Sequence, residues 1–516
     1  MACEHQPVGA ASRGARVPRH SLTRHSLKKF FRLWRRDQRG NVMLMFGLAF
    51  VPLMVAAGAA VDVSRAYIVQ SRLTQALDAA GLAVGSMIGL TEAEMQQRAE
   101  DYFNANYSVN EIGIPATPVV SLVDEVVTLS VAAKLPTAIM RIVGINELDI
   151  HSSVEITRES KNLELMMVLD NTGSMNNNGK IDALKTAAND LIGILFGNEA
   201  FPAKVKVGLV PFAAGVNVGT AFQASGYMDM NAQSSIHSEN FTPGTNLWTL
   251  YNKISNRTWD GCVQTRPDPL DEDDTQPSIG NPDTLWVPWF APDEPDLSGY
   301  SNKYLSDGVS GTADQRQRST VKYNGTSASP SSKGPQYGCD VEALTPLTND
   351  RDGLLQKIAA MVATGYTHIP IGLAWGWRLL SPTPPFTEGV AYGAPDTTKA
   401  IILLTDGENT IPSKSNHNKS DYTGYGYLAQ GRLGTTNAST AENKLDQKTS
   451  TICSNVKAAG IRVYTVTFQL NNTATQNMMR ACATEPSLYY DSPSNAQLRL
   501  VFQNIAQDLS NLRLSR

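Results

Sequence analysis

The longest uncharged apolar segment of the chain runs from Val42 to Val61. A helix of this length, at about 1.5 Å per residue, covers about 30 Å, the thickness of a hydrocarbon core. We therefore expect a transmembrane helix over residues 42–61. Beyond it, small and apolar side chains recur every three or four residues, which predicts that the helix continues as an amphipathic stalk. These side chains are Ala66, Val69, Leu73, Leu77 and Ala80.

The next hundred or so residues alternate between helix and strand signals. Thr91 followed by Glu94 forms a capping-box pattern, which predicts a second helix ending near Asn106. Residues 119–133 are apolar around a turn at 124–125, and residues 148–156 alternate apolar with polar side chains, so both predict strands. We expect a small α+β module over 62–160. His151 falls on the polar face of the last strand, where an exposed structural residue is expected rather than a catalytic one.

The third region, residues 161–516, opens with an apolar run from Leu163 to Leu169, typical of a buried parallel strand. Helical periodicity follows over Lys180–Phe196. Further segments predict alternating strands and helices: 204–212, 350–362, 399–404, 446–459 and 461–468. This alternation predicts an α/β domain with a doubly wound parallel sheet.

Two insertions interrupt this domain, at about 223–342 and 411–443, and both are longer than ordinary loops. We expect them to form a subdomain or a binding surface near the carboxyl edge of the sheet. Large aromatic side chains fit a small local core as well as a recognition patch; they are Trp248, Trp259, Trp286, Trp289 and Phe290. The acidic run 271–274 is expected to be solvated, with a calcium site as the alternative.

Charge is distributed unevenly. The whole chain carries −4, but residues 1–41 hold ten Lys and Arg against two acidic residues. A basic segment directly before an apolar span predicts a cytoplasmic N-terminus, an inner-membrane anchor and a periplasmic remainder. A cleaved signal peptide is the alternative, because Ala57-Gly58-Ala59 resembles a cleavage site, but the basic and apolar segments are both long for one.

Cysteine usage agrees with export. Cys3 precedes the span and the other four follow it, where an oxidising compartment permits disulfides. None of the four has the close spacing of a zinc site. Three pairings are open, and proximity along the chain favours Cys262 with Cys339 and Cys453 with Cys482.

Oxygen-bearing side chains stand where two predicted strands end. Asp170, Thr172 and Ser174 follow the first strand at alternate positions, and Asp406 follows a later one. In doubly wound sheets such ends share one edge and bind ligands. Two carboxylates with neutral hydroxyls suit a hard cation. The alternative is that both aspartates are ordinary caps or turn residues.

These residues resemble a known site. Asp170-x-Thr172-x-Ser174, then Gly365-Tyr366-Thr367, then Leu404-Thr405-Asp406-Gly407-Glu408, resemble in order and spacing the metal-ion-dependent adhesion site of von Willebrand factor A domains. The resemblance implies that Asp170, Thr172, Ser174, Thr367 and Asp406 hold Mg²⁺, with Ca²⁺ or Mn²⁺ as alternatives. Thr172 stands where the family more often has Ser, which keeps the hydroxyl.

Other segments are similar to TadG-like proteins of Flp (tight adherence) pilus assembly, with a TadE/TadG-type anchor. They are Arg39-Gly40-Asn41, residues 59–65, Trp259-Asp260-Gly261-Cys262 and residues 375–382. This resemblance implies a membrane-anchored envelope protein whose partners are pilus assembly components or surface ligands. Met45 stands where a processed prepilin has Glu, so cleavage and polymerisation as a pilin are not expected.

The sequence contains no P-loop, nucleophile elbow, H-E-x-x-H or dinucleotide fingerprint, so we expect no enzyme. The basic segment runs directly into the apolar span, which membrane topology explains, so we expect no nucleic-acid partner. Two functions compete: protein binding through the metal site, and a periplasmic metal-dependent hydrolase using the same ion. The hydrolase needs a general base near a metal-bound water, and Glu408 is the evident candidate.

Overall fold

The computed structural model describes residues 39–85, 87, 90–108, 112–123, 126–157 and 161–514. Most of the basic segment and the expected turn at 124–125 lie outside the described residues. The chain forms two compact units, one with most of a long helix and of a four-stranded sheet, the other with a six-stranded sheet.

The expected membrane span and stalk form one continuous helix, α2 (Arg39–Gly85), with Pro52 inside it. The helix contains a stretch that is long and apolar enough to cross a membrane. Side chains in that stretch are mostly exposed, as Leu48 is (71%), whereas four of the five predicted stalk positions are buried and Ala66 is half-buried. The amphipathic continuation of the helix is therefore confirmed.

The following α+β elements also agree with the sequence. Helix α3 (Glu92–Asn106) begins at the predicted capping box: Thr91 N donates to Glu94 Oε2 at 2.9 Å, and Glu94 N donates to Thr91 Oγ1 at 3.3 Å. The sheet has the order β1-β3-β2, with β4 on β3. His151 is exposed on β4, as predicted. The strands are β1 (Ile114–Pro115), β2 (Val119–Val123), β3 (Val126–Pro136) and β4 (Glu147–Thr157).

A short 3₁₀ helix, η1 (Met140–Val143), joins β3 to β4 and is tied to α2 by Asp62. The buried Asp62 carboxylate accepts hydrogen bonds from the backbone N–H groups of Ala138, Ile139 and Met140 at 2.8, 2.9 and 2.9 Å. Arg65 donates to the same carboxylate at 3.3 Å. The Asp62 side chain therefore ties the β3–β4 connection to the helix.

The larger sheet has the order β12-β11-β10-β5-β6-β9. Its strands pair in parallel except β9, which lies antiparallel to β6 at one edge and was not predicted. Residues Leu163–Asp170 of β5 are all buried, as expected for a central parallel strand. The α/β fold class is confirmed. The strands are β5 (Asn162–Asp170), β6 (Val205–Phe212), β9 (Thr345–Thr348), β10 (Thr397–Thr405), β11 (Arg462–Phe468) and β12 (Tyr489–Ser492).

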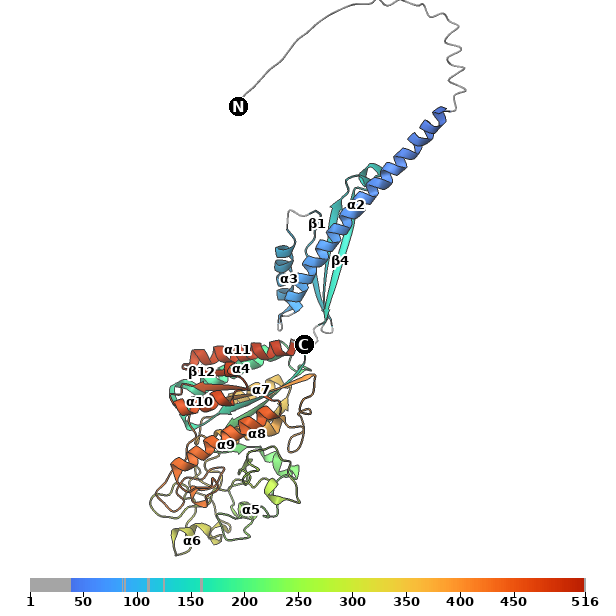
Figure 1. The fold of residues 1–516 in the computed structure, drawn as a ribbon. Helices are drawn as coiled ribbons and strands as arrows, with labels where there is room; N and C mark the ends of the chain where they lie inside the picture. The colour runs from blue at the N-terminus through green and yellow to red at the C-terminus, as the bar shows by residue number, and fades with distance from the viewer. Residues whose placement is uncertain are drawn as a thin grey trace, which may run out of the picture. The chain divides into compact units, whose positions relative to one another are not determined.

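Helices cover both faces of this sheet (Figure 1). Leu165 and Met167 of β5 pack into the layer of α4, α7 and α11, whereas Met166 and Val168 pack into the layer of α8, α9 and α10. This alternation is the side-chain period of a strand buried on both faces. The helices are α4 (Lys180–Phe196), α7 (Arg351–Ala360), α8 (Ile369–Leu380), α9 (Ala438–Ala458), α10 (Thr473–Cys482) and α11 (Asn495–Leu514).

Helix α8 approaches the sheet closely because two of its positions have no side chain. A methyl group built on Gly372 would lie 2.5 Å from the Phe212 ring, and one on Gly376 would lie 2.4 Å from Val168. Trp375 and Trp377 of the same helix are buried and pack the helix into the domain.

The two inserted segments pack together with little regular structure. Thr265 N donates to the Gly424 carbonyl at 2.9 Å, and Arg432 Nη1 donates to Gln264 Oε1 at 3.1 Å, so each segment supplies partners to the other. All five large aromatic side chains are buried, which favours the local core over a recognition patch. The short elements here are α5 (Leu247–Lys253), β8 (Cys262–Val263) and α6 (Ala313–Arg318), and β8 pairs with β7 (Val216–Asn217), which precedes the first insertion.

The four cysteines after the span form the two expected disulfides. Cys262 pairs with Cys339 across the first insertion, and Cys453 of α9 pairs with Cys482 of α10. Both pairs are buried in the domain.

Candidate metal centre

The first candidate ligand, Asp170, ends β5 in the middle of the sheet and is completely buried. Its Oδ1 accepts the backbone N–H of Thr172 at 2.8 Å, which bends the chain back over the strand end. Its Oδ2 accepts the hydroxyl of Thr405, the last residue of β10, at 2.7 Å. The neighbouring strand ends are therefore joined through this carboxylate.

The two hydroxyls of the first loop face the third loop. Thr172 Oγ1 and Ser174 Oγ lie 3.0 Å apart, and Ser174 Oγ donates to Asp406 Oδ1 at 2.6 Å. Asp406 directly follows β10, and its side chain is buried. Four of the five predicted ligands thus belong to one hydrogen-bonded cluster.

The second loop brings Thr367 to the same place. The backbone N–H of Gly173 donates to the Gly365 carbonyl at 3.0 Å, which joins the first and second loops. A methyl group built on Gly407 would lie 3.2 Å from Thr367 Oγ1 and 3.9 Å from Ser174 Oγ. Both hydroxyls therefore face Gly407, and any larger residue there would crowd them.

The electrostatics of the cluster are unusual because two buried carboxylates lie side by side. Burial and the neighbouring charge of Asp406 raise the pKa of Asp170 to about 7. Lys180, the first residue of α4, places its ammonium 2.8 Å from Asp406 Oδ2. The cluster thus holds two carboxylates against one ammonium group.

The donor set fits a small divalent cation. Its side-chain ligands are all oxygens, two from carboxylates and three from hydroxyls, which is the preference of Mg²⁺, Ca²⁺ and Mn²⁺ rather than of softer metals. The raised pKa of Asp170 shows that burial without added positive charge disfavours its ionised form. A cation would supply that charge.

Two nearby residues do not join the cluster. His368 is fully buried beside Thr367, and burial lowers its pKa to about 4, so its side chain is neutral. Its Nε2 lies 3.2 Å from the Thr410 carbonyl, so the residue supports the second loop. Glu408, the base that a hydrolase would need, has an exposed side chain. It lies near Asp446, whose pKa is raised first by burial and then by the charge of Glu408.

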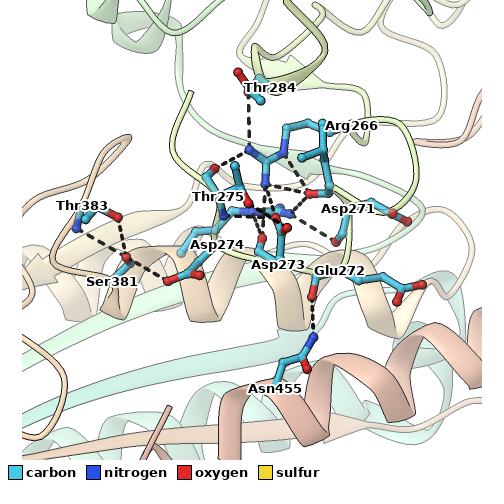
Figure 2. Close-up of polar contacts among 12 residues, drawn as sticks. Arg266, Asp271, Glu272, Asp273, Asp274, Thr275, Thr284, Ser381, Thr383 and Asn455 are labelled. Carbon is cyan, nitrogen blue, oxygen red and sulfur yellow. Dashed lines mark hydrogen bonds and ion pairs between the residues drawn. The ribbon is translucent and has the colours of Figure 1, made fainter. Parts of the chain in front are cut away.

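The acidic run 271–274 proves to be structural, so the expectation of a solvated run is wrong. Asp271 is only 2% exposed. The buried guanidinium of Arg266 donates to Asp273 Oδ1 at 3.2 Å and to the carbonyls of Thr275 and Leu270 at 2.6 and 2.7 Å, so it organises the segment from within (Figure 2).

A lysine side chain occupies the place where the alternative calcium ion would bind. Asp268, Asp271 and Glu272 place carboxylate oxygens close enough together to hold an ion. Lys448 of α9 already lies within 2.6, 2.9 and 2.7 Å of them. The lysine supplies the positive charge that an ion would bring.

Two residues that contact this polar cluster were missed from the sequence. Thr405 could have been found, because it precedes Asp406 at the same strand end. Lys180 carries a subtler signal: a cation at the first position of a helix faces the positive end of the helix dipole, so it needs an acidic partner. Asp406 is that partner, 226 residues away in sequence.

Comparison with known protein families gives a match for the N-terminal segment. Residues 40–87 match the model of the family described as "Putative Flp pilus-assembly TadE/G-like". The match confirms the predicted TadE/G-like character of this segment and covers α2 with little beyond it. A search of curated proteins gave no match.

Solved structures give distant similarities. The chain is similar to the von Willebrand factor domain of the type V pili tip protein Mfa5 from Porphyromonas gingivalis, at 13% identity over 69% of this chain and 97% of that one, with a TM-score of 0.34. For the pilus adhesin SpaC from Lactobacillus rhamnosus GG the identity is 12% over 76% of this chain and 34% of that one, with a TM-score of 0.31. The chain therefore spans about a third of that adhesin.

A third similar structure is proximal thread matrix protein 1 from the mussel byssus, with a zinc-occupied MIDAS motif. Its identity is 11% over 69% of this chain and 47% of that one, with a TM-score of 0.29. At these TM-scores the similarities concern the fold alone, and no functional argument follows from them.

Proposed function

We propose that this chain is a membrane-anchored envelope protein of pilus assembly that binds protein partners through a divalent cation at the carboxyl edge of its larger sheet. The observation that carries the proposal is the convergence of three separate loops on one buried cluster. Asp170, Asp406 and the hydroxyls between them are linked by hydrogen bonds of 2.6–3.0 Å. The site residues are Asp170, Thr172, Ser174, Thr367 and Asp406.

Protein binding is favoured over hydrolysis by the charge balance. Asp406 shares its negative charge with Lys180, so the cluster neutralises a divalent cation incompletely. When bound, such a cation would act as a Lewis acid that accepts a further oxygen ligand. The hydroxyls of Thr172, Ser174 and Thr367 are neutral, so they add no negative charge to balance the cation. The carboxylate of an Asp or Glu from a partner would supply both the missing charge and the further oxygen ligand. The exposed Glu408 is not held toward the cluster by any hydrogen bond recorded for the described residues.

The membrane anchor is part of the same proposal. Helix α2 begins at a basic segment and contains the apolar stretch 42–61. We infer an inner-membrane protein with a cytoplasmic N-terminus, a module at 62–160 and a periplasmic domain from residue 161. A phosphatase reporter fused after Ser160 should be active and one fused at Arg36 inactive; the reverse pattern would contradict the orientation.

The metal site is tested by calorimetric titration of the full-length protein in detergent with Mg²⁺, Mn²⁺ and Ca²⁺ after treatment with a chelator. We expect binding in the wild type and none in Asp170→Asn. Asp182→Asn is the matched control, because Asp182 is an exposed carboxylate on the first turn of α4 outside the cluster. Equal metal binding by the wild type, Asp170→Asn and Asp182→Asn would contradict the proposed metal site.

Partner binding is tested separately by crosslinking in cells, followed by purification with or without a chelator. Crosslinked envelope proteins should be lost in Asp170→Asn and retained in Asp182→Asn. If metal binding is lost while the crosslinks persist, partners bind elsewhere on the protein.

A further inference from the structure

The connection between β3 and β4, residues 137–145, lies against α2 inside the expected membrane span. A methyl group built on Gly58 would lie 2.1 Å from Cγ2 of Ile139, so the isoleucine side chain fills the place of a missing one on the helix. Gly58 precedes the end of the apolar run at Val61 by three residues, or about 4.5 Å along the helix. The hydrogen bonds from Asp62 hold the connection at this height.

The same connection carries large apolar side chains that the rest of the described chain leaves uncovered. Ile142 is 78% exposed, Val143 51% and Ile145 41%. They follow an exposed arginine, Arg141, in the chain. Apolar side chains next to a cation that can reach the headgroup phosphates are typical of segments seated in a membrane surface.

Most backbone N–H groups of the connection have hydrogen-bond acceptors within the protein, so the backbone can lie where little water is present. Ala138, Ile139 and Met140 donate to Asp62, as described above. Four more donate to nearby carbonyls: Thr137 to Asn146 O at 3.0 Å, Ile142 to Ile139 O at 3.0 Å, Gly144 to Arg141 O at 3.1 Å and Ile145 to Met140 O at 3.2 Å. Non-helical backbone tolerates a membrane environment only when its polar groups are satisfied in this way.

We propose that residues 137–145 form a second membrane contact, seated in the surface of the bilayer on the side where α2 leaves it. The inference rests on the proposed membrane anchor, and the occupant of this surface is lipid. The contact continues the lipid-facing surface of α2, since Ile139 packs on the helix within the apolar run. Two attachments, a spanning helix and a wedged connection, fix the tilt and rotation of the module in a way that a single helix does not.

The experiment measures the depth of nitroxide labels. Ile142→Cys is introduced into full-length protein that carries Cys3→Ser, so that the remaining four cysteines are those of the two disulfides. The labelled protein is reconstituted in vesicles of phosphatidylethanolamine and phosphatidylglycerol. Collision of the label with oxygen, which concentrates in lipid, is compared with collision with a water-soluble nickel chelate.

Two further labels serve as controls. Leu48→Cys lies in the apolar run and reports on the anchor, and His151→Cys is an exposed position on β4 outside the connection. We expect labels at positions 48 and 142 to favour oxygen and the label at 151 to favour the nickel chelate. Ile145→Cys should repeat the result of position 142.

The outcomes distinguish a failure of the proposed second membrane contact from a failure of the proposed membrane anchor. If position 48 favours the chelate, the membrane anchor itself fails. If position 48 favours oxygen but 142 favours the chelate as strongly as 151, the second contact is wrong. A label at 142 shielded from both reagents would place a protein chain on this surface and would also overturn the lipid assignment.

Discussion

The ammonium group of Lys180 lies 2.8 Å from Oδ2 of Asp406, and both side chains are buried. Lys180 opens α4, where the helix dipole disfavours a positive charge, so the carboxylate of Asp406 compensates both for burial and for position. The pair therefore sets how much negative charge remains for a cation in the cluster.

Replacing Lys180 should strengthen metal binding. In Lys180→Met the positive charge beside Asp406 is lost. Coulomb's law with an effective dielectric constant of about 20 gives an upper bound of roughly 6–7 kcal/mol for the repulsion between a unit charge and a divalent cation about 5 Å away, so Mg²⁺ should bind at least about tenfold more tightly. Lys180→Arg keeps the charge and should bind much as the wild type does. Calorimetric titration of both variants makes the comparison. Weaker binding by Lys180→Met would show instead that the lysine is needed to position Asp406.

The stability of the metal-free protein should depend on pH through Asp170. Its pKa is about 7 in the folded protein and about 3.9 in an unfolded chain, so the folded state binds more protons between these values. Stability should therefore fall as the pH rises from about 4 to about 7, when measured by thermal unfolding in the presence of a chelator. Asp170→Asn should remove this fall. A wild-type profile that is flat, or that rises, would contradict the raised pKa.

Mg²⁺ should stabilise the protein more at pH 8 than at pH 5. The cation requires the ionised form of Asp170, which the raised pKa disfavours at low pH. The measurement is the increase in unfolding temperature on adding Mg²⁺ at each pH, with Asp170→Asn as the control that should show no increase at either. An equal increase at both values would mean that Asp170 is not a ligand.

Removing the Cys453–Cys482 disulfide should lower the free energy of unfolding by about 3–4 kcal/mol on the chain-entropy estimate for a 29-residue separation. The double variant Cys453→Ser/Cys482→Ser is compared with the wild type in denaturant unfolding followed near α9 and α10.

Peptide mapping without reductant should find both native disulfides in the wild type. Free thiols at these four positions would contradict the pairing.

Asp62→Ala should loosen the connection between β3 and β4. Three backbone N–H groups lose their acceptor, so the amides of Ala138, Ile139 and Met140 should exchange with deuterium faster than in the wild type. Asp149→Ala is the control, because Asp149 is an exposed acidic residue on β4. Unchanged exchange at residues 138–140 would show that other contacts hold the connection in place.

Regular elements could be predicted closely because their signals are local. Helix α4 begins and ends where the periodicity predicted, and β5 extends the predicted run by one residue at each end. The order of apolar segments also predicted the parallel sheet, since alternating strands and helices pack in few ways. The four cysteines after the apolar run left three pairings, of which the one between chain neighbours is present.

The errors concern residues whose surroundings are assembled from distant segments. Asp271 looks like part of a solvated run, but Tyr425, 154 residues later, donates to its carboxylate at 2.9 Å and helps to bury it. Strand β9 has only four residues, and its antiparallel position depends on the edge left free by β6. Lys180 could not be assigned to the metal cluster until the fold brought Asp406 beside it.

The two ends of the α/β domain are joined, since Lys161 N donates to the Arg513 carbonyl at 2.8 Å at the start of β5. The metal cluster lies at the other end of that strand, about 30 Å away at about 3.3 Å per residue. A pull between a partner held at Asp170 and the chain at Lys161 would therefore run along β5. Because both ends of the load would act on β5, its covalent backbone would carry the tension and the hydrogen-bond ladders to β10 and β6 would not be opened one rung at a time. In that case β5 would carry the tension, with the proposed metal site at one end and the preceding chain at the other.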